Sequence, residues 1–459
     1  MSGTVPPMSS LWFESALTPA GWRRHVRLTL ADGRIATVAP DAAPQPGDER
    51  HAIALPGLGN VHSHSFQRAM AGLTERSGAA RDDFWTWRQR MYAFLDRLDP
   101  DDVEAIAEQT FMEMIEAGFT RVGEFHYLHH APDGRPYANI AALAERIAAA
   151  AETTGIALTL LPVFYAHGDF GGRPPVAGQR RFITDLSSFG RLVEGCRRAI
   201  AGLDGAVLGT APHSLRAVVP DELAALQAAY PDGPFHIHVS EQTKEVDDCL
   251  AWSGQRPVAW LMDHAGVDQR WCLIHATHAD ASERAAIAAR QAVVGLCPMT
   301  EASLGDGIFD AVDFQQRGGR WGIGSDSDIL ISAAEELRLQ EYAQRLSRRG
   351  RNLLTGAPDR STGRSLFETA LAGGAQALGQ SAVGLMAGAP ADLFTLDATH
   401  PALVGRTGDE LLDSWMFAAR STPVDTVWRA GRKQVSAGRH VRREAIETRF
   451  CRTMKKLLA

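Results

Sequence analysis

The stretch AIALPGLGNVHSH, residues 52–64, is an apolar run that ends in two histidines separated by one residue. Seven more short apolar runs follow it, and segments with helical periodicity separate most of them. Strands that alternate with helices in this way are typical of a parallel sheet. The later runs are TRVGEFHY (120–127), ALTLLPVFY (157–165), AVLGTAPHS (206–214), PFHIHVSE (234–241), CLIHATH (272–278), AVVGLCP (292–298) and WGIGSDSD (321–328).

Eight strand–helix units predict an α/β fold, with a (β/α)8 barrel over residues 55–383. One of the intervening helices is expected over residues 101–117, because acidic residues begin it and Gly118 follows it. Catalytic groups in such a barrel lie at the carboxyl ends of the strands. The polar residues that close each run are therefore the candidates for a functional site.

The two ends of the chain have a different pattern, with short strands broken by turns. An Asp32-Gly33 pair separates HVRLTL from IATVA and predicts a hairpin. Strands of the same character return after residue 390. We therefore expect residues 1–54 and 384–442 to build one small β-sandwich domain, and residues 443–459 to form a C-terminal helix.

The bulk composition excludes several classes of protein. With 459 residues, 45% of them hydrophobic, the chain is long enough to bury a large core. The net charge of −7 argues against a nucleic-acid partner. No basic leader with an apolar run begins the chain, no run of eighteen apolar residues occurs, and the five cysteines are scattered. These features predict a cytoplasmic protein with no membrane partner.

His62 and His64 point to the same side of their strand, because side chains alternate along a strand, so they can share one metal ion. The pair alone does not distinguish a metal site from two polar residues at a strand end. Strand five adds His238 as a third ligand. Glu241 lies just beyond it, near the metal, where a carboxylate can move protons without binding the ion.

Two further runs end in groups suited to the same site. The run at 272–278 contains His275. The last run contains Asp326, which belongs to the Gly-Ser-Asp sequence that ends its strand. His236 has the same parity as His238 but lies one pleat deeper, so we expect it to be a core histidine. His126, His129 and His130 have no carboxylate partner nearby in the sequence, and we expect them to form a polar rim.

This set of residues resembles the mononuclear deaminase branch of the amidohydrolase superfamily. The resemblance implies that His62, His64, His238 and Asp326 bind one divalent ion, with zinc favoured over iron or manganese. It also implies that Glu241 and His275 are catalytic. A bridging carbamylated lysine of the kind found in binuclear relatives is excluded, since no lysine precedes Lys244. A glutamate bridge through Glu124 stays open.

Five longer strings narrow the resemblance to the N-formimino-L-glutamate deiminases of histidine degradation. They are GNVHSHSFQRAM (59–70), FWTWR (84–88), GEFHY (123–127), APHSLR (211–216) and HIHVSEQ (236–242). The resemblance implies hydrolysis of N-formimino-L-glutamate to N-formyl-L-glutamate and ammonia. It also suggests a homodimer.

A substrate with two carboxylates calls for guanidinium groups, which bind carboxylates with two hydrogen bonds. Arg216 follows the fourth strand, and Arg88 lies in an aromatic excursion over residues 71–100. Gln67, Tyr127 and His213 can add neutral hydrogen bonds, and the resemblance marks all five as substrate-binding. The excursion itself is either a lid over the barrel mouth or an insertion against the barrel flank.

The expected chemistry is attack by a metal-activated hydroxide. Asp326 and His275 orient the water and take its proton, while Glu241 protonates the departing nitrogen. Three alternatives remain at this point. They are a guanine- or adenosine-type aminohydrolase, a hydrolase that releases formamide and glutamate, and a non-catalytic metal-binding relative.

Overall fold

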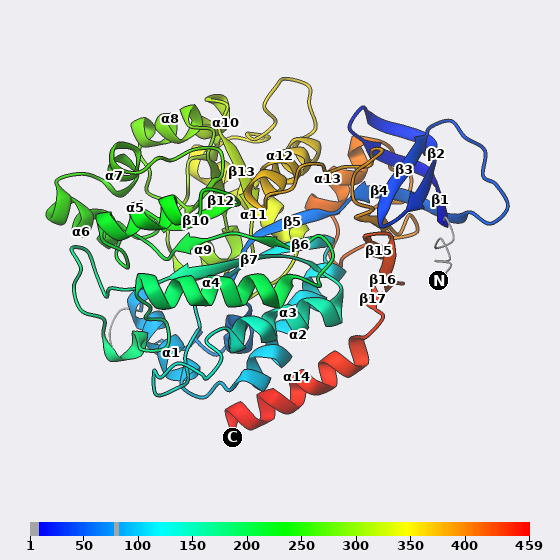
Figure 1. The fold of residues 1–459 in the computed structure, drawn as a ribbon. Helices are drawn as coiled ribbons and strands as arrows, with labels where there is room; N and C mark the ends of the chain where they lie inside the picture. Colours follow the sequence, from blue (N-terminus) through cyan, green and yellow to red (C-terminus); the bar gives the residue numbers. More distant parts are fainter. Residues whose placement is uncertain (1–8, 78–81) are drawn as a thin grey trace.

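The computed structural model describes residues 9–77 and 82–459. It contains two parallel sheets covered by helices and one separate eight-stranded sheet (Figure 1), which confirms the predicted α/β class. Residues 1–8, expected to carry no targeting leader, lie outside the described part of the chain. None of the helices in the described part is both long and apolar enough to cross a membrane.

The eight-stranded sheet joins the two ends of the chain. Its strand order is β17-β16-β15-β14-β4-β1-β2-β3. Asp32 and Gly33 form the expected hairpin turn between β2 and β3, with φ of 50° and 74°. Phe13, Leu28 and Trp428 belong to its apolar core. The strands are β1 (Ser9–Thr18), β2 (Gly21–Ala31), β3 (Arg34–Ala39), β4 (Glu49–Pro56), β14 (Leu393–Leu396), β15 (Val424–Arg429), β16 (Arg432–Ser436) and β17 (Arg439–His440).

The parallel strands coincide with the eight apolar runs. Most are buried along their whole length, which explains why they are apolar without alternation. The fourth run differs, since it divides into two short strands. The strands are β5 (Leu58–Ser63), β6 (Phe119–His126), β7 (Ala157–Phe164), β8 (Val207–Leu208), β9 (Ala211–Pro212), β10 (Phe235–Val239), β11 (Trp271–His275), β12 (Val293–Leu296) and β13 (Arg320–Ile323).

These strands form two sheets whose edges meet. One has the order β5-β6-β7-β8, with β9 paired to β7, and the other has the order β10-β11-β12-β13. Isolated bridges join Ser63 to Asp326 and Thr210 to Phe235. The amide of Asp326 also donates to the carbonyl of His62 at 2.9 Å. The carboxyl ends of strands far apart in sequence therefore lie side by side.

Helices cover the parallel sheets on the outside (Figure 1). The helix predicted over 101–117 is α2, which an Asp99 side chain caps and which ends before Gly118, where φ is 94°. The C-terminal helix α14 packs on α2 and pairs with it through Arg449 and Glu104, 2.7 Å apart.

The helices are η1 (Ser65–Met70), α1 (Phe84–Leu95), α2 (Pro100–Glu116), α3 (Ala142–Thr154), η2 (Ala177–Gln179), α4 (Leu186–Ile200), α5 (Pro220–Ala229), α6 (Thr243–Ser253), α7 (Pro257–His264), α8 (Ala281–Ala289), α9 (Pro298–Leu304), α10 (Ala311–Gln316), α11 (Ala333–Arg348), α12 (Thr362–Ala377), α13 (Asp409–Phe417) and α14 (Arg443–Leu458).

Candidate metal and catalytic site

The four predicted metal ligands meet at the carboxyl ends of β5, β10 and β13. The Nε2 atom of His62 lies 3.2 Å from that of His64 and 3.0 Å from that of His238. A carboxylate oxygen of Asp326 lies 3.4 Å from His62 Nε2 and 3.3 Å from His64 Nε2. All four side chains are buried, and their ligand atoms lie within 4.8 Å of one another.

The backbone fixes which nitrogen of two imidazoles faces the cluster. His64 Nδ1 donates to the Phe125 carbonyl at 3.1 Å, and His238 Nδ1 donates to the His213 carbonyl at 3.0 Å. Each Nε2 therefore presents a lone pair to the cluster. Burial lowers the pKa of His62, His64 and His238, so the rings are neutral, as metal ligands must be.

The spacing of these atoms fits a metal ion. Four ligands held tetrahedrally at about 2.0–2.1 Å from a zinc ion lie roughly 3.3–3.4 Å from one another. Four of the six distances between the ligand atoms of this cluster are 3.0 to 3.4 Å, and all six are within 4.8 Å. In the absence of an ion, the lone pairs of His64 and His238 and the Asp326 carboxylate would face one another with at most the one proton of His62 Nε2 among them. The donor set therefore fits one divalent ion.

Glu124 does not join this cluster. Its carboxylate accepts hydrogen bonds from the Ser63 hydroxyl at 2.9 Å and from the amide and hydroxyl of Ser65 at 3.0 and 2.7 Å. Burial raises the pKa of Glu124 to about 7. Its oxygens are thus occupied behind β5, and it belongs to neither group of candidate ligands found in the described chain.

The three predicted catalytic side chains lie beside the cluster. His275 Nε2 is 3.9 Å from a Glu241 oxygen and 3.7 Å from an Asp326 oxygen. Burial raises the pKa of Glu241 to about 7. Burial also lowers the pKa of His275, but the carboxylates of Glu241, Glu301 and Asp326 outweigh it and raise that pKa to about 10. These groups can hold and exchange protons near neutral pH.

Glu301 is a contact that the sequence did not suggest. Its carboxylate lies 3.2 Å from His275 Nδ1 and accepts the Cys297 amide at 2.9 Å. This bond directs His275 Nε2 towards Glu241 and Asp326. Glu301 follows the seventh run by only a few residues, but nothing in its local pattern separates it from an ordinary helix residue of α9.

The backbone around the site is strained. Ser240, His275, Ala276, Asp326 and Asp328 all have φ between 47° and 67°, although none is a glycine. Left-handed conformations of this kind cost of order 1–3 kcal/mol each and persist where the surrounding structure imposes them. They bend the chain at the ends of β10, β11 and β13, and so aim the functional side chains.

A cavity of about 50 Å³ opens above the cluster, and all five predicted substrate-binding residues line it. Gln67 donates to the Tyr127 hydroxyl at 3.1 Å, and burial lowers the pKa of His213. Apart from the metal-ligand and catalytic residues, the remaining walls are apolar or aromatic. Besides these five, the lining consists of His64, Phe84, Trp87, Met91, Tyr92, Tyr165, Phe182, His238, Glu241, His275, Leu304 and Asp326.

The two arginines of the cavity have free donors. The Nε atoms of Arg88 and Arg216 are buried and have no hydrogen-bond partner within the described chain. Their guanidinium carbons lie 4.5 and 5.8 Å from the centre of the Trp85 ring, which holds them by cation–π contact. This arrangement suits a ligand that brings its own negative charge.

Helix α1 settles the position of the excursion over residues 71–100. Phe84, Trp87, Arg88, Met91 and Tyr92, all on this helix, form one wall of the cavity. The excursion therefore reaches the mouth of the site and is not confined to the flank. Its residues 78–81 lie outside the described part of the chain.

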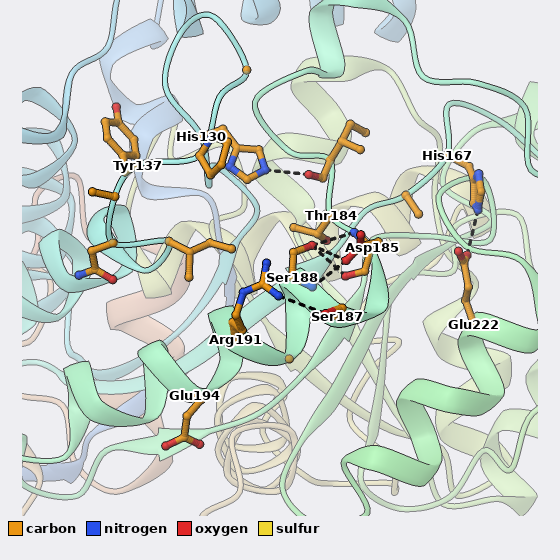
Figure 2. Close-up of a pocket in the computed structure, with 18 of the residues that line it drawn as sticks. His130, Tyr137, His167, Thr184, Asp185, Ser187, Ser188, Arg191, Glu194 and Glu222 are labelled. Atoms are coloured by element: carbon orange, nitrogen blue, oxygen red, sulfur yellow. Dashed lines mark hydrogen bonds and ion pairs between the residues drawn. The ribbon is translucent and has the colours of Figure 1, made fainter.

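A second, larger hollow of about 1140 Å³ contains none of the predicted site residues. Figure 2 shows that several of its polar side chains bond one another. His167 pairs with Glu222 at 3.0 Å, and the Ser188 hydroxyl donates to Asp185 at 2.7 Å. Several of its polar groups are thus paired with one another, and none of the candidate metal-ligand or catalytic residues lines this hollow.

The expectation that His126, His129 and His130 form a polar rim is wrong, because all three are buried. His129 and His130 bond the carbonyls of Val163 and Ile183 at 2.9 and 2.7 Å. Packing of the β6–α3 connection against β7 and the segment that follows it explains the burial of His129 and His130. His236 is a core histidine as predicted, and its Nε2 donates to the Ala377 carbonyl at 2.8 Å.

Comparison with known proteins is consistent with this geometry. The amidohydrolase family model matches residues 53–433, and the model for the N-terminal domain of formimidoylglutamate deiminase HutF matches residues 8–52. The formimidoylglutamate deiminase of Pseudomonas aeruginosa is 51% identical over 98% of this chain and all of its own. A 5-methylthioadenosine/S-adenosylhomocysteine deaminase of Pelotomaculum thermopropionicum is 28% identical over 89% of this chain and 88% of its own.

Solved structures give the same picture of the fold. An amidohydrolase from Brucella melitensis superposes with a TM-score of 0.96 at 52% identity, over 98% of this chain and all of that one. An adenosine deaminase from Xanthomonas campestris, solved with bound zinc, superposes with a TM-score of 0.81 at 20% identity, over 98% of both chains. The latter likeness bears on the fold alone.

Proposed function

The chain belongs to the amidohydrolase family, in its formimidoylglutamate deiminase branch, and from this premise we propose how its site performs that reaction. The protein is a hydrolase that acts on a C–N bond. It converts N-formimino-L-glutamate to N-formyl-L-glutamate and ammonia, a step of histidine degradation. The observation that carries the assignment of roles is that two arginines with free donors share one buried cavity with the His/Asp cluster.

His62, His64, His238 and Asp326 would hold a single divalent ion, and we propose zinc because three neutral imidazoles and a carboxylate are ligands that zinc accepts in tetrahedral sites. When bound, such an ion lowers the pKa of a coordinated water to about 7 and makes it a nucleophile at neutral pH. Glu124 takes no part, since Ser63 and Ser65 occupy its oxygens.

The protein's own groups then move the protons. Water adds to the formimino carbon while Asp326 accepts its proton. His275, whose pKa of about 10 keeps it protonated at neutral pH, orients the water oxygen as a hydrogen-bond donor. Glu241, whose pKa lies at about 7, donates a proton to the terminal nitrogen. The C–N bond breaks, and that nitrogen leaves as ammonia rather than as an amide anion. The other nitrogen stays on glutamate as part of the formamide group.

Arg88 and Arg216 bind the carboxylates of the substrate, and Gln67, Tyr127 and His213 add neutral hydrogen bonds around it. A guanine- or adenosine-type aminohydrolase is the alternative, since the same ion and acid can deaminate a ring. A neutral purine would bring no carboxylate to the free Nε donors of Arg88 and Arg216, which disfavours that reading.

We also propose that the two parallel sheets close into one (β/α)8 barrel over residues 55–383. The bridges from Ser63 to Asp326 and from Thr210 to Phe235 support closure on both sides. Residues 1–54 and 384–442 would form the β domain, and residues 443–459 the C-terminal helix. A cytoplasmic location is proposed on the five cysteines, all of which have free thiols.

The substitution Arg216→Met tests the assignment of the substrate carboxylate. Loss of a charge-assisted hydrogen bond costs about 1.5–3 kcal/mol, so we expect kcat/KM for N-formimino-L-glutamate to fall roughly 10- to 100-fold. Metal content, measured by plasma emission spectroscopy, is expected to stay at one ion per chain. Equal loss of metal and activity would show that Arg216 is structural.

A further inference from the structure

Glu245, in the first turn of α6, connects two parts of the site that the proposed mechanism uses separately. Its side chain is fully buried. One carboxylate oxygen accepts the Ser240 amide at 3.1 Å, and the other accepts the Glu241 amide at 3.3 Å. The second oxygen also lies 3.8 Å from an Nη atom of Arg216.

The first of these connections holds the turn that carries Glu241. Ser240 has a φ of 51°, a conformation that a residue other than glycine adopts only under constraint. The Glu245 carboxylate captures the two consecutive amides of this turn, and the Ser240 carbonyl accepts the His278 amide at 3.0 Å. Together these bonds direct the Glu241 side chain into the cavity, beside His275.

The second connection holds Arg216. This guanidinium is buried, and Glu245 is the only carboxylate in an ion pair with it among the described residues. A buried cation without a partner is costly, so Glu245 stabilises Arg216 in its charged form. The pair at 3.8 Å still leaves the Arg216 Nε donor free for a ligand.

We propose that Glu245 is a positioning residue that couples Arg216, which binds the substrate carboxylate, to Glu241, the proton donor of the reaction. The inference rests on the proposed function, because it assigns Arg216 to substrate and Glu241 to the leaving nitrogen. Movement of Arg216 on substrate binding is transmitted through one carboxylate to the backbone of Glu241. Glu245 touches neither substrate nor metal.

The substitution Glu245→Gln tests the coupling. The amide has one acceptor oxygen in place of two, so its NH2 group must face either the Ser240 amide or the shared position of the Glu241 amide and Arg216. We expect kcat to fall at least tenfold and KM to rise at least tenfold. The dissociation constant of the product N-formyl-L-glutamate, measured by calorimetry without turnover, should rise in parallel with KM, while metal content stays at one ion per chain.

Double-mutant cycles separate coupling from simple loss of structure. Glu245→Gln combined with Arg216→Met should raise KM little beyond Arg216→Met alone. Combined with Glu241→Gln, it should lower kcat little beyond Glu241→Gln alone. Additive effects in both cycles would overturn the proposal.

Glu341 provides a matched control. It is also a fully buried glutamate whose two oxygens accept consecutive amides, from Leu353 and Leu354 at 2.9 and 3.0 Å, and it pairs with Arg345 at 2.7 Å. It lies outside the cavity. Glu341→Gln is expected to lower Tm as Glu245→Gln does, yet to leave kcat and KM within twofold of wild type.

If Glu245→Gln changed Tm alone, as the control does, Glu245 would be only structural and the proposal would be wrong. If Glu245→Gln fails to fold, the variant Glu245→Asp tests the coupling in its place. The shorter acid keeps the charge near Arg216 but cannot reach both amides, so it should lower kcat more than it raises KM, and unchanged kcat would refute the coupling. Failure of the proposed function itself is distinct, since the wild-type protein would then release no ammonia.

Discussion

At the scale of single residues, the direction of the His275 imidazole depends on Glu301. The carboxylate at 3.2 Å accepts a hydrogen bond from Nδ1 and so directs Nε2 towards Glu241 and Asp326. We predict that Glu301→Gln lowers kcat roughly 10- to 100-fold, the range found when such supporting carboxylates are removed. Steady-state kinetics should show KM within about threefold of wild type. A change in KM with kcat preserved would place Glu301 at the substrate instead.

The site residues that the sequence predicts lie on or directly after strands, whereas the positions of Glu245 and Glu301, which were not predicted, depend on other features of the fold. Strand alternation places His62 and His64 on one side, and His238 and Asp326 lie at strand ends, but only the family resemblance identifies all four as a ligand set. Glu245 depends on the left-handed turn at Ser240, which places a residue five positions downstream back against the site. Glu301 lies on α9, after the strand that pairs with the strand of His275. No sequence pattern predicts a left-handed backbone conformation at a residue other than glycine.

At the scale of elements, the contact between β5 and β13 brings Asp326 to the histidines. Gly324 permits it, because a Cβ there would lie 2.8 Å from the His62 amide nitrogen and carbonyl oxygen. We predict that Gly324→Ala forces these strands apart, costs about 1–3 kcal/mol and lowers metal content. Gly202→Ala is the control, since nothing lies within 4 Å of a Cβ there. Full metal occupancy in Gly324→Ala would refute this role.

The strands were predictable as buried apolar runs, with one exception. In the run at 206–214, Val207 and Leu208 pair with β7, whereas Thr210 bridges to Phe235 on the neighbouring sheet. Ala211 and Pro212 then pair with β7 again, so the run divides into the two short strands β8 and β9. Hydrophobicity reports burial but not the hydrogen-bond partner, and the break was therefore invisible in the sequence.

At the scale of the whole molecule, the terminal sheet depends on an ion pair. Asp48 accepts bonds from Arg27 at 3.0 Å and from Ser10 at 2.5 Å. The Arg27 guanidinium holds the pKa of the Asp48 carboxyl well below its value of 3.8 in unfolded chains. The pair therefore stabilises the fold fully above pH 3.8, and this contribution is lost as the pH falls towards the lower, folded pKa.

We predict that Asp48→Asn lowers stability by about 0.2–1 kcal/mol at pH 6, and that the difference in Tm from wild type narrows below about pH 4. Thermal unfolding followed by circular dichroism measures this. Arg27→Gln breaks the same ion pair from its other side, and it should remove the same pH-dependent contribution to stability. A difference in Tm that widens in acid would contradict the assignment.

The joining of the two chain ends was suggested by their shared character of strands and turns, but their order in the sheet was not. β4 pairs with β14 over residues more than 300 positions apart, through contacts such as Leu55 with Phe394. Register between such distant strands depends on which apolar faces meet once the parallel sheets between them have formed.

The most direct test of the central claim identifies the products of the zinc-loaded protein. With N-formimino-L-glutamate as substrate, we expect ammonia and N-formyl-L-glutamate in equal amounts, with activity lost on chelation and restored by one zinc ion per chain. Formamide and glutamate as products, or ammonia from guanine with none from N-formimino-L-glutamate, would contradict the account.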